Sequence, residues 1–297
     1  MDDGYRERFY SSQDNLRLYF RDYGDARANT TPVLCLGGLT RNAKDFHDVA
    51  LHLSPRRMLC PDYRGRGRSA YDRNWRHYVP ATYINDLVHL LAATNLHRVI
   101  VLGTSFGGLL AMALAVAAPT ALAGVILNDI GPEVNMTGFG RILDFIRKDR
   151  PVKDWHTASR EMKVMFPALS IHDDAGWLTM AQNTYREGSD GLLHFDWDVR
   201  IVKPHFEAGG VLPDMWPMFR ALRRIPTLAL RGEISDVLSQ ETFDRMAREK
   251  PDLERASIPG VGHAPTLAEP TARDAVGQFL AGLWHDRARH DIPRHDI

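Results

Sequence analysis

Three side chains that could supply a nucleophile, an acid and a base stand far apart in this 297-residue chain, in the order Ser105, Asp236, His263. A serine hydroxyl becomes a good nucleophile only when a base takes its proton, and histidine is the base whose pKa suits neutral pH. The histidine in turn needs a carboxylate that fixes its tautomer and stabilises the imidazolium ion. These residue types in this order predict nucleophilic catalysis at a carbonyl group.

The sequence around Ser105 has the form that places a serine at the tip of a sharp turn. The apolar residues 99–102 are followed by Gly-Thr-Ser-Phe-Gly and then by the helix-forming residues 109–115. This pattern predicts a strand, a tight turn and a helix, which is the setting of a nucleophile elbow. The small Gly103 and Gly107 would let the strand and the helix pass closely. The alternative is a serine that only caps the helix.

His263 is one of 13 histidines, so its position rather than its type singles it out. It follows the last predicted strand, residues 253–258, and directly follows Gly262. The carboxyl ends of parallel strands meet at one edge of a sheet, so a residue there can reach Ser105. We therefore predict His263 as the base.

Several carboxylates could orient that histidine. Asp236 follows the strand and turn at residues 225–232, and we predict that it is the acid of the triad. Asp129 also follows a predicted strand and is the alternative acid, while Glu233 is a weaker candidate. Asp236 could instead cap the helix that comes after it.

Two backbone N–H groups are needed to stabilise the oxyanion that forms when a serine attacks a carbonyl. One is predicted to come from Phe106, the residue after the nucleophile, at the start of a helix. The second is predicted to come from Leu39, because Gly38 lets the preceding loop turn freely. The alternative is that Gly37 and Gly38 merely end a strand.

Strands that alternate with single helices position these residues. The predicted strands alternate with helices from residue 32 onward, after an N-terminal antiparallel hairpin, and this rhythm predicts a parallel sheet of right-handed βαβ units. The expected organisation is a core at residues 1–131 and 215–286, an inserted helical cap at residues 132–214, and a flexible tail at residues 287–297. The tail repeats Arg-His-Asp-Ile, and a frayed end is favoured there over a metal site.

The predicted cap carries helical stretches, many aromatic side chains and several methionines. Such a surface suits an apolar or aromatic substrate, although the same residues could simply form the core of the cap. Candidate substrate-binding residues are Trp155 and Trp177 in the cap, Gly38 in the loop of residues 37–39 that we call the oxyanion loop, and Arg41 just after that loop.

Composition excludes several other kinds of protein. There are 37 Lys and Arg residues and 37 Asp and Glu residues, so a zero net charge gives no reason to expect nucleic acid as a partner. No apolar stretch is long enough to span a membrane or resembles a signal peptide. The two cysteines, Cys35 and Cys60, each end an apolar stretch and are expected to be buried free thiols. We therefore expect a cytoplasmic protein that uses neither a metal nor a cofactor.

Taken together, these motifs resemble the α/β-hydrolase fold superfamily over nearly the whole chain. The resemblance rests on Gly37-Gly38, the turn at residues 62–69, the elbow around Ser105, Asp236, and Gly262-His263. It implies an α/β fold with an eight-stranded, mostly parallel sheet, flanked by helices, and a helical cap after the sixth strand. Gly37 stands where the superfamily usually has histidine. Arg64 and Arg66 in the turn are expected to be structural.

The nucleophile narrows the reaction. Relatives that are haloalkane dehalogenases or epoxide hydrolases use aspartate at the elbow, whereas Ser105 implies an acyl-enzyme. The predicted activity is hydrolysis of an ester, lactone or thioester of a small-molecule substrate. Hydrolysis of a C–C bond in a β-diketone-like substrate is the alternative within the class. A ligand receptor without activity or an acyltransferase could use the same fold.

Overall fold

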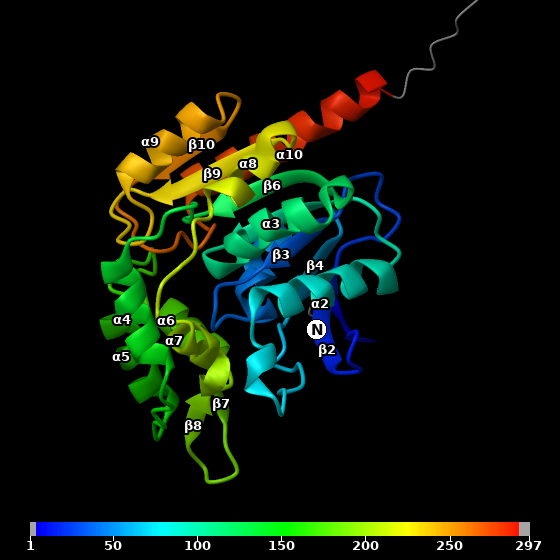
Figure 1. The fold of residues 1–297 in the computed structure, drawn as a ribbon. Coiled ribbons are helices and arrows are strands. Elements are labelled where there is room, and N and C mark those ends of the chain that lie inside the picture. The colour runs from blue at the N-terminus through cyan, green and yellow to red at the C-terminus, as the bar shows by residue number, and fades with distance from the viewer. Residues whose placement is uncertain (1–3, 291–297) are drawn as a thin grey trace, which may run out of the picture.

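The computed structural model describes residues 4–290 and contains one eight-stranded sheet (Figure 1). Its strands lie in the order β1-β2-β4-β3-β5-β6-β9-β10. Their bounds are β1 Tyr5–Ser11, β2 Arg17–Tyr23, β3 Val33–Leu36, β4 Met58–Pro61, β5 Val99–Thr104, β6 Leu122–Asn128, β9 Thr227–Gly232 and β10 Glu254–Ile258. β1, β2 and β4 pair antiparallel, and every pairing from β4 to β10 is parallel. The predicted fold class is confirmed.

The sheet is buried on both faces because its central strands are apolar almost throughout, and every residue of β3 and β6 is buried. One face packs on α2 (Pro80–Ala93), α3 (Phe106–Ala117), α8 (Trp216–Arg220) and α9 (Gln240–Glu249). The other face packs on η1 (Ala43–Phe46), α1 (His47–His52) and α10 (Pro270–His290). Alternate residues of one strand therefore enter different cores: Val101 of β5 lies in the first and Leu102 in the second.

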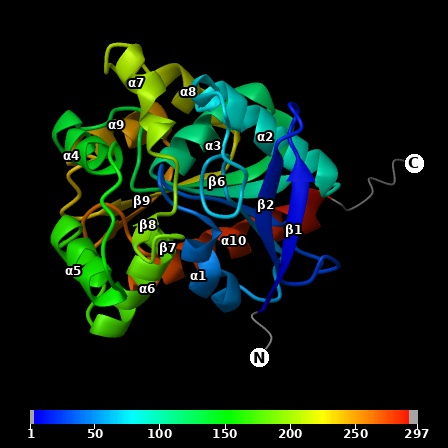
Figure 2. The same ribbon diagram turned by 90° about the horizontal axis from the view of Figure 1, so that it is seen from below.

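Along the described chain, an inserted segment separates β6 from β9 and contributes no strand to the large sheet (Figures 1 and 2). Its elements gather at one side of the sheet in both views. They are α4 Met136–Ile146, α5 Trp155–Met165, α6 Asp174–Thr184, β7 Tyr185–Glu187, β8 Leu193–Phe195, η4 Val199–Val202 and α7 Lys203–Glu207. The antiparallel hairpin β7–β8 departs from the expected all-helical segment. We call residues 132–214 the insertion; its independence as a cap stays a prediction.

The end of the chain also differs from the expected one. α10 continues to His290, so residues 287–290 are helical rather than part of a loose tail. The rest of the predicted tail, residues 291–297, lies outside the described residues. Cys35 and Cys60 are both buried and unpaired, as expected. Within residues 4–290, no helix has the length and apolar character needed to cross a membrane.

Candidate active site

Ser105 stands at the turn between β5 and α3 with a backbone φ of 53° and ψ of −118°. A non-glycine residue with positive φ is strained, and here the surrounding packing enforces it. A Cβ on Gly107 would come within 2.0 Å of the Leu36 carbonyl oxygen, and one on Gly103 within 2.5 Å of the Gly107 carbonyl oxygen. Glycine is therefore required at both positions for the helix to meet the sheet this closely.

His263 lies directly beside Ser105. Its Nε2 is 2.8 Å from Ser105 Oγ, and its Nδ1 is 2.7 Å from Asp129 Oδ2. An ionised carboxylate can only accept, so Nδ1 carries the proton and a neutral ring leaves Nε2 free to accept from the serine hydroxyl. The histidine side chain is only 7% exposed. The predicted serine and histidine are thus brought together in the arrangement that general-base catalysis needs.

The carboxylate that contacts His263 is Asp129 and not Asp236. Our prediction that Asp236 orients the histidine is therefore wrong. Asp129 directly follows β6, and its side chain is fully buried. Besides His263, it accepts hydrogen bonds from the Gly232 N–H at 2.7 Å and from the Ser235 hydroxyl at 2.6 Å. These donors stabilise the ionised carboxylate and hold it in place.

Asp236 directly follows Ser235, in the loop between β9 and α9. Its Oδ2 accepts from Arg141 of α4 at 2.7 Å, and its side chain is 45% exposed. A Cβ on Gly138 would lie 2.3 Å from the Asp236 carbonyl oxygen, so this loop is packed against the first turns of α4. Ser235, which the sequence analysis did not single out, takes the position next to Asp129 instead. The alternative acid, Asp129, was recognisable by its place immediately after a strand.

The candidate oxyanion donors flank Ser105. Phe106 is the first residue of α3, and a Cβ on Gly38 would lie 3.9 Å from Ser105 Cβ. Within the described residues, neither the Phe106 nor the Leu39 N–H has a protein acceptor. Unpaired N–H groups beside the nucleophile are what an oxyanion hole requires, so both assignments stay as predictions that the geometry supports.

Arg41, predicted to contact the substrate, instead binds side chains of the protein. Its guanidinium binds Asp45 through two hydrogen bonds of 2.6 Å and donates to Thr184 of α6 at 2.7 Å. Nearby, Asn42 donates to the Asn183 carbonyl and Lys44 to the Gln182 carbonyl. The segment after the oxyanion loop therefore fastens α6 of the insertion to the core.

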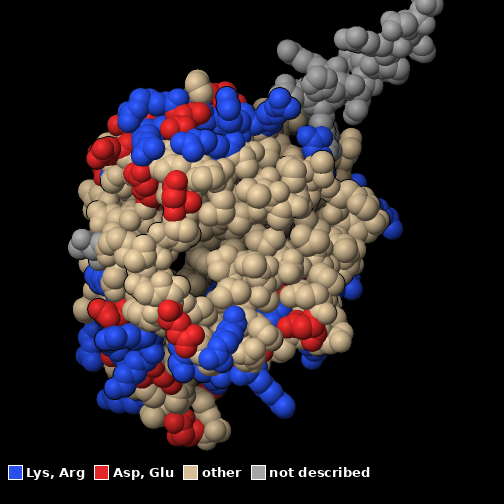
Figure 3. All heavy atoms as spheres, viewed as in Figure 1, with Lys and Arg blue, Asp and Glu red and all other residues tan. Residues whose placement is uncertain are grey.

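The two candidate tryptophans belong to the packing of the insertion. Trp177 is buried in the first core, and Trp155 packs against the same cluster. Figure 3 shows a face hollowed between the sheet and the insertion, among uncharged side chains. A separate hollow of about 410 Å³ is lined by charged side chains of α8, η5 (Ala221–Arg224) and α9, namely Arg220, Arg223, Arg245, Arg248 and Glu249. It contains no predicted site residue.

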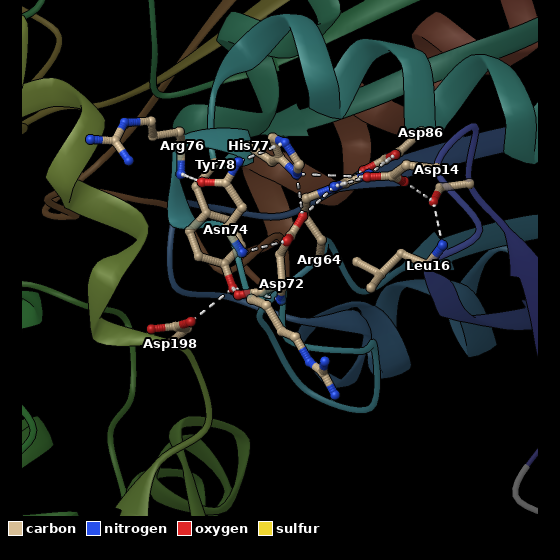
Figure 4. Close-up of polar contacts among 12 residues, drawn as sticks. Asp14, Leu16, Arg64, Asp72, Asn74, Arg76, His77, Tyr78, Asp86 and Asp198 are labelled. Atoms are coloured by element: carbon tan, nitrogen blue, oxygen red, sulfur yellow. Dashed lines mark hydrogen bonds and ion pairs between the residues drawn. The ribbon is translucent and has the colours of Figure 1, made fainter.

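The turn at residues 62–69 has a structural network at its base (Figure 4). The fully buried Arg64 binds Asp86 through two hydrogen bonds and donates to Asp14 and Asp72. Asp14, Asp72 and His77 come close enough to share a cation, but the Arg64 guanidinium already supplies the positive charge among them. This network joins the β1–β2 hairpin, the turn and α2.

Comparison with known proteins agrees with this geometry. The sequence profile of the Alpha/beta hydrolase family matches residues 33–274. The chain belongs to this family. It is therefore a hydrolase of the α/β fold, as the resemblance implied.

Relatives match the chain over most of its length. An α/β hydrolase structure from Novosphingobium aromaticivorans has a TM-score of 0.87 and 44% identity, with 94% of this chain and 98% of that one covered. A 3-hydroxybutyrate-oligomer hydrolase of Cupriavidus necator is 31% identical, with 90% of this chain and 93% of that protein covered. A 2-(acetamidomethylene)succinate hydrolase of Mesorhizobium japonicum is 23% identical, with 82% and 83% covered.

Proposed function

We propose that this α/β hydrolase is a serine esterase that works through an acyl-enzyme, with Ser105, His263 and Asp129 as its triad. The observation that carries the proposal is the continuous hydrogen-bonded line from Ser105 Oγ to His263 Nε2 and from His263 Nδ1 to Asp129 Oδ2. This line contains a nucleophile, a base within reach of its proton, and a carboxylate that orients the base.

In the proposed reaction, Ser105 Oγ bonds to the ester carbon while its proton moves to His263 Nε2. The N–H groups of Phe106 and Leu39 would stabilise the oxyanion of the tetrahedral intermediate. The C–O bond to the alcohol then breaks, and His263 returns the proton to the leaving oxygen. Water then attacks the acyl carbon while its proton moves to His263 Nε2. The bond between that carbon and Ser105 Oγ breaks, and His263 returns the proton to Oγ as the carboxylic acid leaves. Asp129 stabilises the imidazolium ion in both halves of the reaction.

For the substrate, we propose a small ester with an apolar acyl group. The relative from Cupriavidus necator is named for 3-hydroxybutyrate oligomers, and joining the hydroxyl group of one such unit to the carboxyl group of the next gives an ester bond. The uncharged surroundings of the hollow between the sheet and the insertion suit an acyl chain of this kind. We further propose a cytoplasmic location, because both cysteines are unpaired and buried.

A substrate screen combined with active-site labelling tests this proposal. We expect p-nitrophenyl esters and 3-hydroxybutyrate dimers to be hydrolysed, and a fluorophosphonate probe to label the protein at Ser105. The Ser105→Ala variant should lose both activities while staying folded. Faster turnover of a vinylogous β-diketone than of any ester would instead indicate C–C bond hydrolysis. Labelling that persists in Ser105→Ala would refute Ser105 as the nucleophile.

A further inference from the structure

Arg66 is a buried cation without a carboxylate partner. Its side chain is fully buried, and no acidic residue of the described chain forms an ion pair with it. Its neighbour Arg64, equally buried, is surrounded by three carboxylates. The rings of Tyr63, Tyr78 and Tyr83 lie within about 6 Å of its guanidinium and offset part of the cost of burying the charge. Burying a cation without a carboxylate is still costly, so we looked for a role in what its hydrogen bonds hold.

The hydrogen bonds of Arg66 lead to the oxyanion loop. Nε donates to the Leu39 carbonyl oxygen at 2.8 Å. Nη1 donates to the Tyr83 hydroxyl at 2.6 Å and to the Arg64 carbonyl oxygen at 2.8 Å, whereas Nη2 is buried without a partner. The guanidinium is thus anchored on one side to α2 and on the other to the residue predicted to supply an oxyanion donor.

The Leu39 carbonyl group that Arg66 binds lies in the middle of a tight turn. Residues 38–41 form a turn in which the Arg41 N–H donates to the Gly38 carbonyl oxygen at 3.0 Å. The Leu39–Thr40 peptide is the central unit of that turn, and it can rotate between turn types without breaking this bond. The hydrogen bond from Arg66 fixes the orientation of that peptide and so restricts ψ of Leu39. It holds the chain directly after the candidate Leu39 N–H in one conformation.

Arg66 also connects the insertion to this loop. Its backbone pairs with Trp197 in an isolated antiparallel bridge, and the Gly67 N–H donates to the Asp196 carbonyl oxygen at 2.9 Å. The ring of Tyr83, whose hydroxyl accepts the hydrogen bond from Nη1, packs edge-on against Phe106 with ring centroids 5.5 Å apart. Arg66 thus meets the insertion through its backbone and the oxyanion loop through its side chain, and its partner Tyr83 packs against Phe106.

We propose that Arg66 is a positioning residue that holds the oxyanion loop in its active conformation and couples that conformation to the seating of the insertion. This inference rests on the proposed serine esterase function. It assigns the buried guanidinium a role in stabilising the transition state, exerted through Leu39, beyond the purely structural role expected from the sequence.

The test compares Arg66→Met with Arg68→Met, a matched change in the same turn at a side chain that is 55% exposed. We expect Arg66→Met to lower kcat for p-nitrophenyl esters by about 10- to 100-fold, somewhat less than the loss of an entire oxyanion donor. KM should change by less than about threefold. The rate of fluorophosphonate labelling of Ser105 should fall with kcat, because the phosphoryl oxygen uses the same donors. Arg68→Met should behave as wild type.

Two further variants keep the inference testable if Arg66→Met does not fold. Arg66→Lys keeps the charge but lacks the planar fork, and it should recover only part of the lost kcat. Tyr83→Phe removes one anchor of Arg66 and should lower kcat by about threefold to tenfold at constant KM. The inference fails if the folded Arg66 and Tyr83 variants match Arg68→Met in both kcat and labelling rate. Absence of labelling in the wild-type protein would refute the proposed function instead, so the two failures are distinguishable.

Discussion

At the scale of single residues, the site depends on which carboxylate reaches His263. Asp129 is fully buried and receives three hydrogen bonds, one of them from the histidine. Asp236 is partly exposed and pairs with Arg141. A carboxylate held so tightly can fix a tautomer, whereas a solvated one that binds an arginine has no access to the imidazole.

Substitution of the two aspartates should therefore have very different effects. We expect Asp129→Asn to lower kcat by about 10⁴-fold, because an amide would favour the wrong histidine tautomer. Asp236→Asn is the matched control and should stay within about threefold of the wild-type kcat. Steady-state kinetics on a p-nitrophenyl ester measures both. A larger loss for Asp236→Asn would restore our original assignment.

At the scale of elements, the close contact between β5, β3 and α3 determines where Ser105 stands. A methyl group at position 107 would overlap the Leu36 carbonyl oxygen of β3. Any side chain there would push α3 away from β3 and so displace Ser105. Helix α10, on the opposite face, has no such constraint at Gly277, where a Cβ would meet nothing within 4 Å.

Two glycine substitutions test this difference. Gly107→Ala should lower the free energy of unfolding by about 3 kcal/mol, because the backbone must shift to accept the methyl group. Gly277→Ala, in the middle of α10, should raise it by about 0.5–1 kcal/mol, because alanine favours the helix. Urea unfolding followed by circular dichroism gives both values. Equal effects of the two changes would contradict the close packing at the elbow.

The Arg64 network makes a second prediction at this scale. The hydrogen bond from Arg64 lowers the pKa of Asp14 below its ordinary value. A carboxyl group with a lowered pKa contributes stability above its unfolded-state pKa of about 3.9, and this contribution is lost as the pH falls below that value. Asp14→Asn should therefore cost about 1 kcal/mol at pH 7, a value discounted for the partial exposure of Asp14.

The pH dependence provides the check on that prediction. Urea unfolding of the wild type and of Asp14→Asn should give free energies that differ at pH 7 and begin to approach each other near pH 3, because the carboxyl group is protonated there in the unfolded chain but still ionised in the folded protein. A difference that stays constant between pH 7 and pH 3 would show that the charge of Asp14 contributes nothing.

At the scale of the whole molecule, the insertion sits over the edge of the sheet that carries Ser105 and is fastened there by polar contacts. The Gly262 N–H, directly before His263 in the chain, donates to the Ala168 carbonyl oxygen at 2.7 Å. Arg41 and Lys44 bind α6 and its C-terminal end. The insertion therefore borders the site, and we expect it to determine which acyl groups enter.

An exchange of residues 132–214 with the corresponding segment of the relative from Novosphingobium aromaticivorans tests that expectation. The preference among p-nitrophenyl esters of increasing acyl length should follow the donor of the segment, while fluorophosphonate labelling of Ser105 stays complete. A length preference that follows the rest of the chain would show that the core sets specificity.

The sequence by itself determined the order of the main elements, the elbow and two members of the proposed triad. Local patterns carry this information: the apolar run before Ser105, the glycines around it and the position of His263 after the last strand are all visible in short windows. The insertion was also visible, because the alternation of strands and helices stops after residue 132. Its small hairpin was not, since strands of three residues leave almost no periodic pattern.

Only the tertiary structure decided between Asp129 and Asp236. Both follow strands, but β6 lies next to β5 in the sheet, and Asp129 comes directly after it. Asp236 is four residues beyond the end of β9, in a loop that turns toward α4 and Arg141. The direction of a loop depends on contacts between residues distant in sequence, which no local pattern contains. The same reason explains why the partners of Arg41 and Arg66, on α6 and in the oxyanion loop, appeared only in the folded chain.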